Sequence, residues 1–323
     1  MDGGQEFGSQ TLSSTYVFKM IEVLLDGVLP IFAIVVIGYA LGKRGIFDKN
    51  SAAVINKFVF LVAIPALGLH LIANAPFSLF DWRMIIGFFL SELAIYALGA
   101  FTAHFLFKCE LKESILLGLA ASFGNHILYV LPIAISLFGE DATLAFVAII
   151  AVDSILIFGS TIAIIEVMTA KNTLWADISK KIFLNPPLIS MLLGIFLVIS
   201  NVKIPNGFNT FLNFVGDVAA PSALFSLGII LSQISGLGRR GPAISISTFK
   251  LIVHPLFALI ILVSISGLTL TQAKIPMIAA AAPCGTMAFV LALHYGVRTD
   301  AIVPAILLTT IGSLLSVTLA ASI

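Results

Sequence analysis

The sequence predicts an all-α integral membrane protein with ten transmembrane helices in two inverted repeats of five helices. Hydrophobic residues make up 59% of the 323 residues and charged residues only 10%, whereas soluble domains carry about 25% charged residues. Ten apolar runs of about 17 residues or more follow one another, and each is long enough to cross the hydrocarbon core of a bilayer. Short motifs of the first half also recur in the second half.

The ten predicted spans are joined by short polar loops. They cover, in order, about residues 22–42, 54–72, 84–107, 114–138, 142–168, 184–201, 216–234, 244–266, 274–296 and 301–322. Spans four and nine, which hold equivalent places in the two halves, each contain a polar interruption near the middle.

The predicted domain organisation follows from these spans. Residues 1–19 are polar and lack the apolar core of a signal peptide, so we expect a polar N-terminal tail, either native or an added leader. Residues 20–169 then hold repeat 1 with spans one to five, and residues 184–323 hold repeat 2 with spans six to ten. The polar stretch 170–183 is predicted to be a short cytoplasmic linker.

Two pairs of prolines support the repeat. Pro187 follows Pro30 by 157 positions, and Pro221 follows Pro65 by 156 positions, which is close to half the chain. Each repeat has an odd number of spans, so the second must enter the membrane upside down relative to the first. Such inverted repeats are typical of secondary transporters.

The distribution of positive charge predicts the orientation. If the N-terminus lies outside, thirteen of the 17 Lys and Arg residues fall in inner loops or at the inner ends of spans. Positive residues concentrate on the cytoplasmic side of membrane proteins. We therefore expect a multi-pass protein of the plasma or inner membrane with both termini on the outer side.

The interruptions of spans four and nine indicate a binding site. They are Ala121–His126 and Ala282–Thr286. An unpaired backbone group in hydrocarbon costs several kcal/mol, so a break survives only where protein or a water-filled cavity covers it. Matched breaks in two repeats point to a transporter's binding site, and free N–H groups at a helix N-terminus favour an anion.

The residues of the two breaks are the candidate substrate contacts, because they present backbone groups or polar side chains. They are Gly124, Asn125, His126, Pro283, Cys284, Gly285 and Thr286. A purely structural interpretation remains open, in which Pro and Gly only kink two long helices.

Four ionisable residues within the spans form a second candidate set. They are Glu92, Asp153, Lys250 and His254. Each costs about 2.5–3.5 kcal/mol at a helix centre, so a reason for its presence is expected. One interpretation makes them proton or ion relays that couple transport, and the other makes them hydrogen-bonding groups that hold the helix bundle together.

Several function classes are disfavoured. The two cysteines, Cys109 and Cys284, lie in different segments and suggest neither a disulfide framework nor a metal site. No basic run indicates nucleic acid, and we expect no cofactor. The sequence has no H-E-x-x-H, G-x-S-x-G or Walker pattern, which argues against an enzyme or an ATP-driven pump. Gly38 and Gly42 fit G-x-x-x-G, a pattern for helix packing or for a dimer face.

The sequence resembles the auxin efflux carrier family, which includes plant PIN carriers and bacterial permeases for malate- and malonate-like anions. The match extends from about Val28 to Ser316. The residues that carry it are Pro30, Gly38, Tyr39, Asn56, Lys57, Pro65, His70, Asn125, Asn185, Pro186, Phe225, Ser226, Leu227, Gly228, Lys250, Pro255, Ala282, Pro283, Tyr295 and Asp300.

The resemblance implies that spans four and nine cross at their breaks, with the substrate beside the crossing. It also implies a homodimeric scaffold of spans one, two, six and seven, against which the other spans slide like an elevator. Plant carriers have Pro-Asn where this chain has Gly124-Asn125, and many have a long central loop where this chain has a short one. These departures favour a bacterial-type carrier over an auxin carrier.

The sequence therefore predicts a secondary transporter of organic anions, either carboxylates or auxin-like acids, with proton or sodium coupling. Three alternatives stay open. A sodium-coupled symporter resembling the bile-acid carriers would share this topology and depend on sodium. A membrane sensor would keep the carrier fold and signal instead. An intramembrane enzyme would turn its ligand over instead of moving it.

Overall fold

The structure is a computed structural model that describes residues 29–130, 133–134, 138, 141–169, 184–233 and 239–322. The described residues are almost entirely helical, and they form no strand beyond one isolated β-bridge. The predicted tail 1–19 and the predicted linker 170–183 lie outside the described residues.

The described part of the first half contains seven α-helices, with short π-helical turns between some of them. In order they are α2 (Leu29–Lys43), α3 (Lys49–Phe58), η2 (Val59–Ala63), α4 (Ile64–Ala73), α5 (Trp82–Phe101), η4 (Thr102–Leu106), α6 (Leu111–Ser122), η5 (His126–Val130), α8 (Asp141–Asp153), η6 (Ser154–Gly159) and α9 (Ser160–Thr169), with a 3₁₀ turn η3 (Phe77–Leu79) before α5. These are the helices of the described residues only.

The second half begins at the cap of α11. Its helices are α11 (Pro186–Ile199), α12 (Asn206–Gly216), α13 (Ala219–Gln233), α14 (Arg240–Thr248), η7 (Phe249–Val253), α15 (His254–Ile260), η8 (Ile261–Ile265), α16 (Leu270–Ala280), α17 (Met287–His294) and α18 (Ile302–Ser322).

Helix ends follow local sequence signals. The Asp48 side chain accepts a hydrogen bond from the Ser51 N–H at 2.8 Å and caps α3. Asn185 caps α11 in the same way, and two prolines occupy the first turn of that helix. Proline suits this position because its missing N–H would have no partner within the helix.

Among the described residues, six helical stretches are long and apolar enough to cross a membrane. They are Lys49–Ala73, Trp82–Leu106, Leu144–Thr169, Asn206–Gln233, Arg240–Ile265 and Ile302–Ala321. They correspond to predicted spans two, three, five, seven, eight and ten, so the integral membrane class is confirmed. Spans one and six correspond to shorter apolar helices, Ala33–Lys43 and Pro186–Ile199.

The predicted span seven, residues 216–234, corresponds to α13 (Ala219–Gln233). A turn at Asp217 and Val218 separates α13 from α12, which precedes the predicted span.

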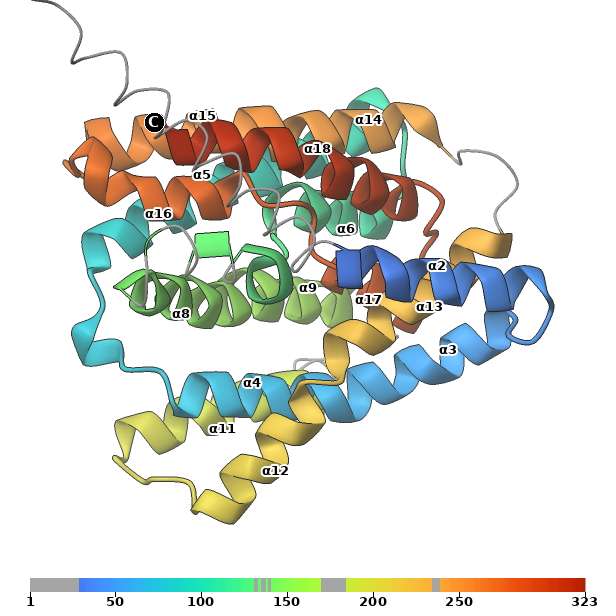
Figure 1. Ribbon diagram of the computed structural model, residues 1–323, viewed down its shortest axis with the longest axis horizontal. Helices are drawn as coiled ribbons and strands as arrows, with labels where there is room; N and C mark the ends of the chain where they lie inside the picture. Colours follow the sequence, from blue (N-terminus) through green and yellow to red (C-terminus); the bar gives the residue numbers. More distant parts are fainter. Residues whose placement is uncertain are drawn as a thin grey trace, which may run out of the picture.

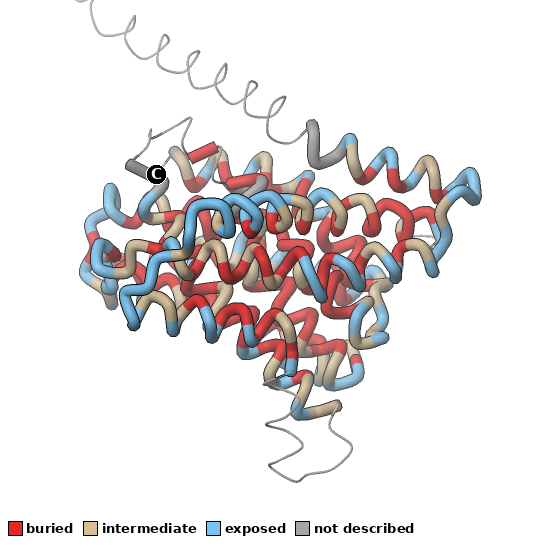
Figure 2. Tube along the Cα trace, turned by 90° about the horizontal axis from the view of Figure 1, so that it is seen from below, coloured by how far each residue is buried: buried red, intermediate tan, exposed pale blue. Residues whose placement is uncertain are grey.

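The helices form two groups (Figure 1). In the first group α2 packs on α13, and α4 packs on α11 and α12. The second group contains α5, α6, α8, α9, α14, α15, α16 and α18, and α17 contacts both α6 and α3. Buried residues gather in the interior of the molecule, whereas its outer helix faces are exposed (Figure 2). Many exposed side chains there are large and apolar, as expected of a surface that faces lipid.

Glycines allow α2 and α13 to approach closely. A Cβ at Gly38 would lie 2.3 Å from the carbonyl oxygen of Phe225, and one at Gly228 would lie 2.1 Å from that of Val35. A Cβ at Gly42 would lie 2.2 Å from the Ser232 Oγ. The G-x-x-x-G pattern of α2 is therefore a packing face within the chain.

Candidate functional site

Two interrupted helices cross in the middle of the molecule. Helix α6 ends at Ser122, and α16 ends at Ala280, both within predicted spans. Beyond these ends Gly124 forms an antiparallel bridge with Cys284. Helical backbone resumes at His126 in one segment and at Met287 in the other.

The two breaks satisfy each other's backbone groups. The Asn125 N–H donates to the Pro283 carbonyl oxygen at 2.9 Å, and the Gly285 N–H donates to the Phe123 carbonyl oxygen at 2.9 Å. Because peptide groups in hydrocarbon need a partner, this exchange is what makes the interruptions tolerable at this depth. A Cβ at Gly124 would lie 2.4 Å from the His126 Nε2 and 3.0 Å from the Ala282 Cβ, so a larger residue there would displace the His126 ring.

Helix α18 supports the second break from behind. The Thr309 Oγ1 accepts a hydrogen bond from the Cys284 N–H at 3.0 Å. The Ser316 hydroxyl donates to the Ala281 carbonyl oxygen at 2.8 Å. These two hydrogen bonds tie α18 to the backbone of the second break.

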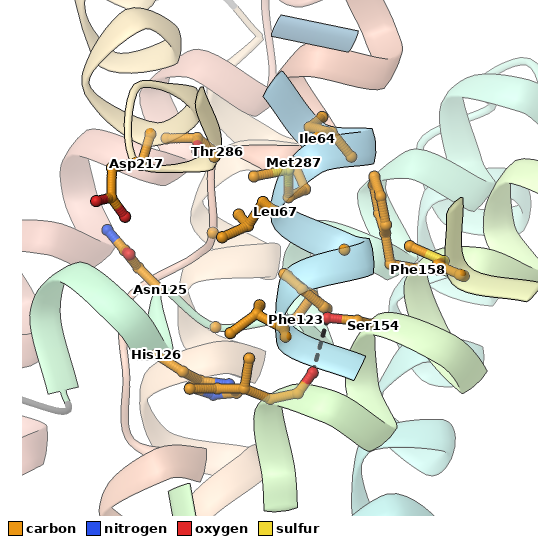
Figure 3. Close-up of a pocket in the computed structure, with 18 residues that line it drawn as sticks. Ile64, Leu67, Phe123, Asn125, His126, Ser154, Phe158, Asp217, Thr286 and Met287 are labelled. Atoms are coloured by element: carbon orange, nitrogen blue, oxygen red, sulfur yellow. Dashed lines mark hydrogen bonds between the residues drawn. The ribbon is translucent and has the colours of Figure 1, made fainter. Parts of the chain in front are cut away.

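A cavity of about 120 Å³ lies beside the crossing. Figure 3 shows the side chains around it. The lining comes from the breaks, from the α8–η6 segment, and from α4, α11, α12 and α13; it consists of Ile64, Leu67, Gly68, Leu71, Phe123, Gly124, Asn125, His126, Ile150, Ser154, Phe158, Met191, Gly216, Asp217, Ala220, Gly285, Thr286 and Met287. The cavity therefore lies between the two groups of helices.

Five of the seven candidate substrate contacts line this cavity, and two do not. The five are Gly124, Asn125, His126, Gly285 and Thr286, whereas Pro283 and Cys284 lie outside its lining. Cys284 is buried and free of a disulfide. Sequence reasoning missed the apolar wall from α4 and the one carboxylate of the lining, Asp217.

The cavity is polar at one end. The side chains of Asn125 and Asp217 point toward one another there (Figure 3), and Asp217 also accepts a hydrogen bond from the Asn213 amide at 3.1 Å. The first helical hydrogen bond of α17 runs from the Val290 N–H to the Thr286 carbonyl. Earlier N–H groups of α17 have no partner within that helix, so its positive end is at the cavity wall formed by Thr286.

A buried cluster of ionisable residues lies behind the crossing. It consists of Glu92 on α5, His126 on η5, Asp153 on α8, Lys250 on η7 and His254 on α15. All five side chains are buried. The structure therefore brings together the four residues that the sequence marked for coupling or bundle stability, and it adds His126 to them.

The contacts in this cluster are specific. The Asp153 Oδ2 lies 3.2 Å from the His126 Nδ1, and neither carboxyl oxygen of Glu92 has a hydrogen-bond partner among the described residues. The Lys250 Nζ donates to the Ser122 carbonyl oxygen at 2.6 Å and lies 3.1 Å from the His254 Nδ1. A lysine ammonium group only donates, so the His254 Nδ1 is the acceptor.

Three further hydrogen bonds link α3 to α17, and α9 to the cap of α11 and to Tyr295. The Asn56 side-chain amide on α3 donates to the Val290 carbonyl oxygen of α17 at 2.8 Å. The Tyr295 hydroxyl donates to the Glu166 Oε1 at 2.8 Å, and the same oxygen accepts a bond from the Asn185 amide at 2.8 Å.

Known proteins resemble this chain over most of its length. A family model described as "Membrane transport protein" matches residues 23–321. An uncharacterized transporter of Methanocaldococcus jannaschii is 28% identical over 305 residues, which cover 91% of this chain and 97% of that protein. A protein of Rhizobium meliloti named "Putative malonate transporter" is 25% identical over 298 residues, with 90% and 92% covered. Auxin efflux carrier component 3 of Arabidopsis thaliana is 25% identical over 150 residues, 46% of this chain and 23% of that protein.

Proposed function

Since the chain belongs to the membrane transport protein family, whose members include auxin efflux carriers, we propose that it is a secondary transporter of small organic anions. The chain is a membrane transporter and not an enzyme. The proposal concerns the substrate class and the mechanism.

The proposal is carried by one observation: the positive end of α17 and the Asn125 amide both lie at the wall of the same mainly apolar cavity. A helix N-terminus stabilises an anion through free N–H groups. A volume of about 120 Å³ is small beside the roughly 300–1,000 Å³ of sites for drug-sized ligands. A three-carbon dicarboxylate such as malonate, which the name of the Rhizobium relative suggests, suits this space better than a bulky indole acid.

We propose that Gly124, Asn125, His126, Gly285 and Thr286 contact the anion directly. Pro283 and Cys284 then act indirectly, because their backbone groups hold the bridge that shapes the cavity. The polar end of the cavity would take a carboxylate group, and the apolar wall from α4 and Met191 would take the carbon chain.

An elevator mechanism in a homodimer of ten-span subunits fits the packing. In the first group of helices span one packs on span seven, and span six packs on span two. This reciprocal exchange is what two inverted repeats would produce. The cavity between the groups would open to either side as the second group slides, with both termini outside as the charge distribution predicts.

The buried cluster is compatible with two coupling ions, a proton and a sodium ion. Both carboxyl oxygens of Glu92 lack a hydrogen-bond partner among the described residues, and such oxygens could take a sodium ion or a proton. The sodium-coupled alternative is therefore retained as a second candidate, and it predicts that uptake stops when sodium is replaced by choline.

The test uses purified full-length protein in liposomes that contain unlabelled malonate, with uptake of radiolabelled malonate by exchange. We expect saturable exchange by the wild type and an apparent KM at least tenfold higher for Asn125→Ala, because an amide donor at the anion is lost. Asn50→Ala, on the exposed surface of α3, is the matched control and should behave as the wild type.

A thermal-shift screen with malonate, malate and indole acids complements the flux measurement, since a ligand that binds the folded state raises its stability. Absence of both stabilisation and exchange for every small carboxylate would contradict the proposed substrate class. An Asn125→Ala protein that folds and exchanges malonate at the full rate would remove Asn125 from the site.

A further inference from the structure

The Asn185 side chain is oriented by the helix that it caps. Its Oδ1 accepts a hydrogen bond from the Leu188 N–H at 3.4 Å, in the first turn of α11. The amide nitrogen therefore points away from that helix. It donates to the Glu166 Oε1 at 2.8 Å and to the Tyr295 hydroxyl at 3.2 Å. Because the cap fixes the oxygen, the amide presents its two N–H donors in a defined direction.

Glu166 and Tyr295 complete a closed set of contacts with this amide. The Tyr295 hydroxyl donates to the same Glu166 Oε1 at 2.8 Å, so one carboxylate oxygen accepts two hydrogen bonds. Hydrogen bonds to an ionised acceptor are stronger than those between neutral groups. Asn185 is only 4% exposed, and Glu166 and Tyr295 are half-buried. We call these three residues the Asn185 cluster.

The Asn185 cluster joins the two groups of helices. Asn185 caps α11 of the first group, whereas Glu166 lies on α9 of the second group. Tyr295 ends α17, which follows the second break and packs on α6. Both hydrogen bonds of the Asn185 amide therefore cross the boundary between the groups. If one group slides against the other, both of these bonds must break.

Span two holds the same end of α17 from another side. The Phe60 ring, which is 1% exposed, stacks on the His294 ring with the centroids 3.6 Å apart. The Asn56 amide donates to the Val290 carbonyl oxygen at 2.8 Å. Asn56 and Phe60 lie on α3 and η2, which continue into α4 of the first group. Polar and aromatic contacts thus attach the end of α17 to the first group.

These contacts lie at one end of the cavity. The order of the spans places the end of α9, the start of α11 and the end of α17 on the same side of the membrane, which is the inner side if both termini lie outside. In Figure 1, α9 and α3 lie to the right of α8 and α4, which line the cavity. The Asn185 cluster does not line the cavity itself. The cluster therefore closes the boundary between the groups on the inner side of the cavity.

We propose that Glu166, Asn185 and Tyr295 form a gate, which blocks the path from the cavity to the inner side and opens when the second group slides. This inference rests on the proposed anion transport. Opening separates the Asn185 amide from the Glu166 carboxylate, and a buried polar group without a partner is costly. Water must therefore enter as the gate opens, and it gives an anion a hydrated path to the cavity.

An exchange of the two polar groups tests the gate. Asn185→Asp keeps an oxygen that can cap α11, but it replaces the amide donors with a second carboxylate opposite Glu166. Repulsion between the two carboxylates should open the gate. Adding Glu166→Gln returns an amide to the contact from the other side, so the double variant should close the gate again. Asn206→Asp, at the exposed start of α12 in the first group, is the matched control.

The readout is the rate at which a cysteine in the cavity reacts with a charged, membrane-impermeant thiosulfonate. Ser154→Cys supplies this cysteine, because Ser154 lines the cavity, in a parent protein whose two native cysteines are replaced by serine. Inverted membrane vesicles expose the inner side to the reagent, and right-side-out vesicles expose the outer side.

Asn185→Asp should react about tenfold faster than the parent from the inner side, because charge-assisted hydrogen bonds that hold the gate are lost. The double variant and Asn206→Asp should react at the rate of the parent. No variant should react faster from the outer side. A general loosening of the protein would instead raise the rate from both sides.

Three results would overturn the inference. They are an unchanged inner rate in Asn185→Asp, an increased rate from the outer side, and a double variant that reacts as fast as Asn185→Asp. If Asn185→Asp does not fold, Tyr295→Phe replaces it, since this change removes only a hydroxyl group and its hydrogen bonds to Glu166 and Asn185. It should raise the inner rate about threefold, and an unchanged rate would again overturn the inference.

Malonate exchange by the wild type is measured separately in liposomes. The labelling rates need no substrate, so a failure of the gate leaves the proposed function standing. Absence of malonate exchange contradicts the proposed function whatever the labelling rates show.

Discussion

Lys250 donates from a fully buried ammonium group to the carbonyl oxygen of Ser122, 2.6 Å away, and so caps the last turn of α6 at the crossing. The C-terminal end of a helix carries partial negative charge, which a cation stabilises. Lys250 therefore stabilises the end of α6 at the first break.

Replacing this lysine should destabilise the protein. Lys250→Met leaves the Ser122 carbonyl without its partner and removes a buried cation, a change that costs about 3 kcal/mol in comparable sites. We expect the melting temperature in detergent to fall by roughly 5–10 °C. Lys250→Gln retains an amide donor and should recover part of the loss. Equal melting temperatures for wild type and Lys250→Met would show that the cap contributes nothing.

The contact between α2 and α13 gives a second prediction. Gly228→Ala places a Cβ 2.1 Å from a backbone oxygen of Val35, which no side-chain rotation relieves. We expect a loss of about 2–3 kcal/mol, typical of overpacking, measured by thermal unfolding and by the yield of monodisperse protein.

Gly207→Ala is the matched control for this substitution. A Cβ at Gly207 on α12 meets no atom within 4 Å, so alanine there should be neutral or stabilise the helix slightly. If both variants lost stability equally, the close approach of α2 and α13 would not be the cause.

The carboxylate of Asp217 gives a third prediction. It lines the cavity opposite Asn125 and is a negative charge at the polar end where we propose an anion binds. Asp217→Asn removes that repulsion and should lower the apparent KM for malonate by roughly three- to tenfold. Asp81→Asn, an exposed carboxylate before α5, is the control. Weaker malonate binding by Asp217→Asn would mean that this carboxylate holds the substrate or its proton instead.

The breaks could be predicted from the sequence because their cause is local. Gly124 and Pro283 weaken a helix wherever they occur, and matched positions in two halves marked them as a pair. The residues that line the cavity could not all be predicted in this way, because some of them lie far from the breaks in the sequence. Asp217 lies in the turn after α12, and nothing in its neighbourhood indicates that it faces a break almost a hundred positions away.

The pairing of Asp153 with His126 shows the same limit. Asp153 stood out as an ionisable group in an apolar span and His126 as part of the first break, but their 3.2 Å contact depends on how α8 is rotated against η5. Hydropathy along α8 has almost no periodicity, since apolar residues surround the whole helix. The sequence therefore identified the residues and left their partners open.

The exchange of hydrogen bonds between the breaks also bears on how the chain is made. The Asn125 N–H finds its acceptor at Pro283, 158 positions later in synthesis. At roughly 5–20 residues per second, the ribosome needs about 8–30 s to supply that acceptor. Until then the first break must rely on water, lipid headgroups or the insertion machinery, so the first repeat becomes complete only once the second has entered the membrane.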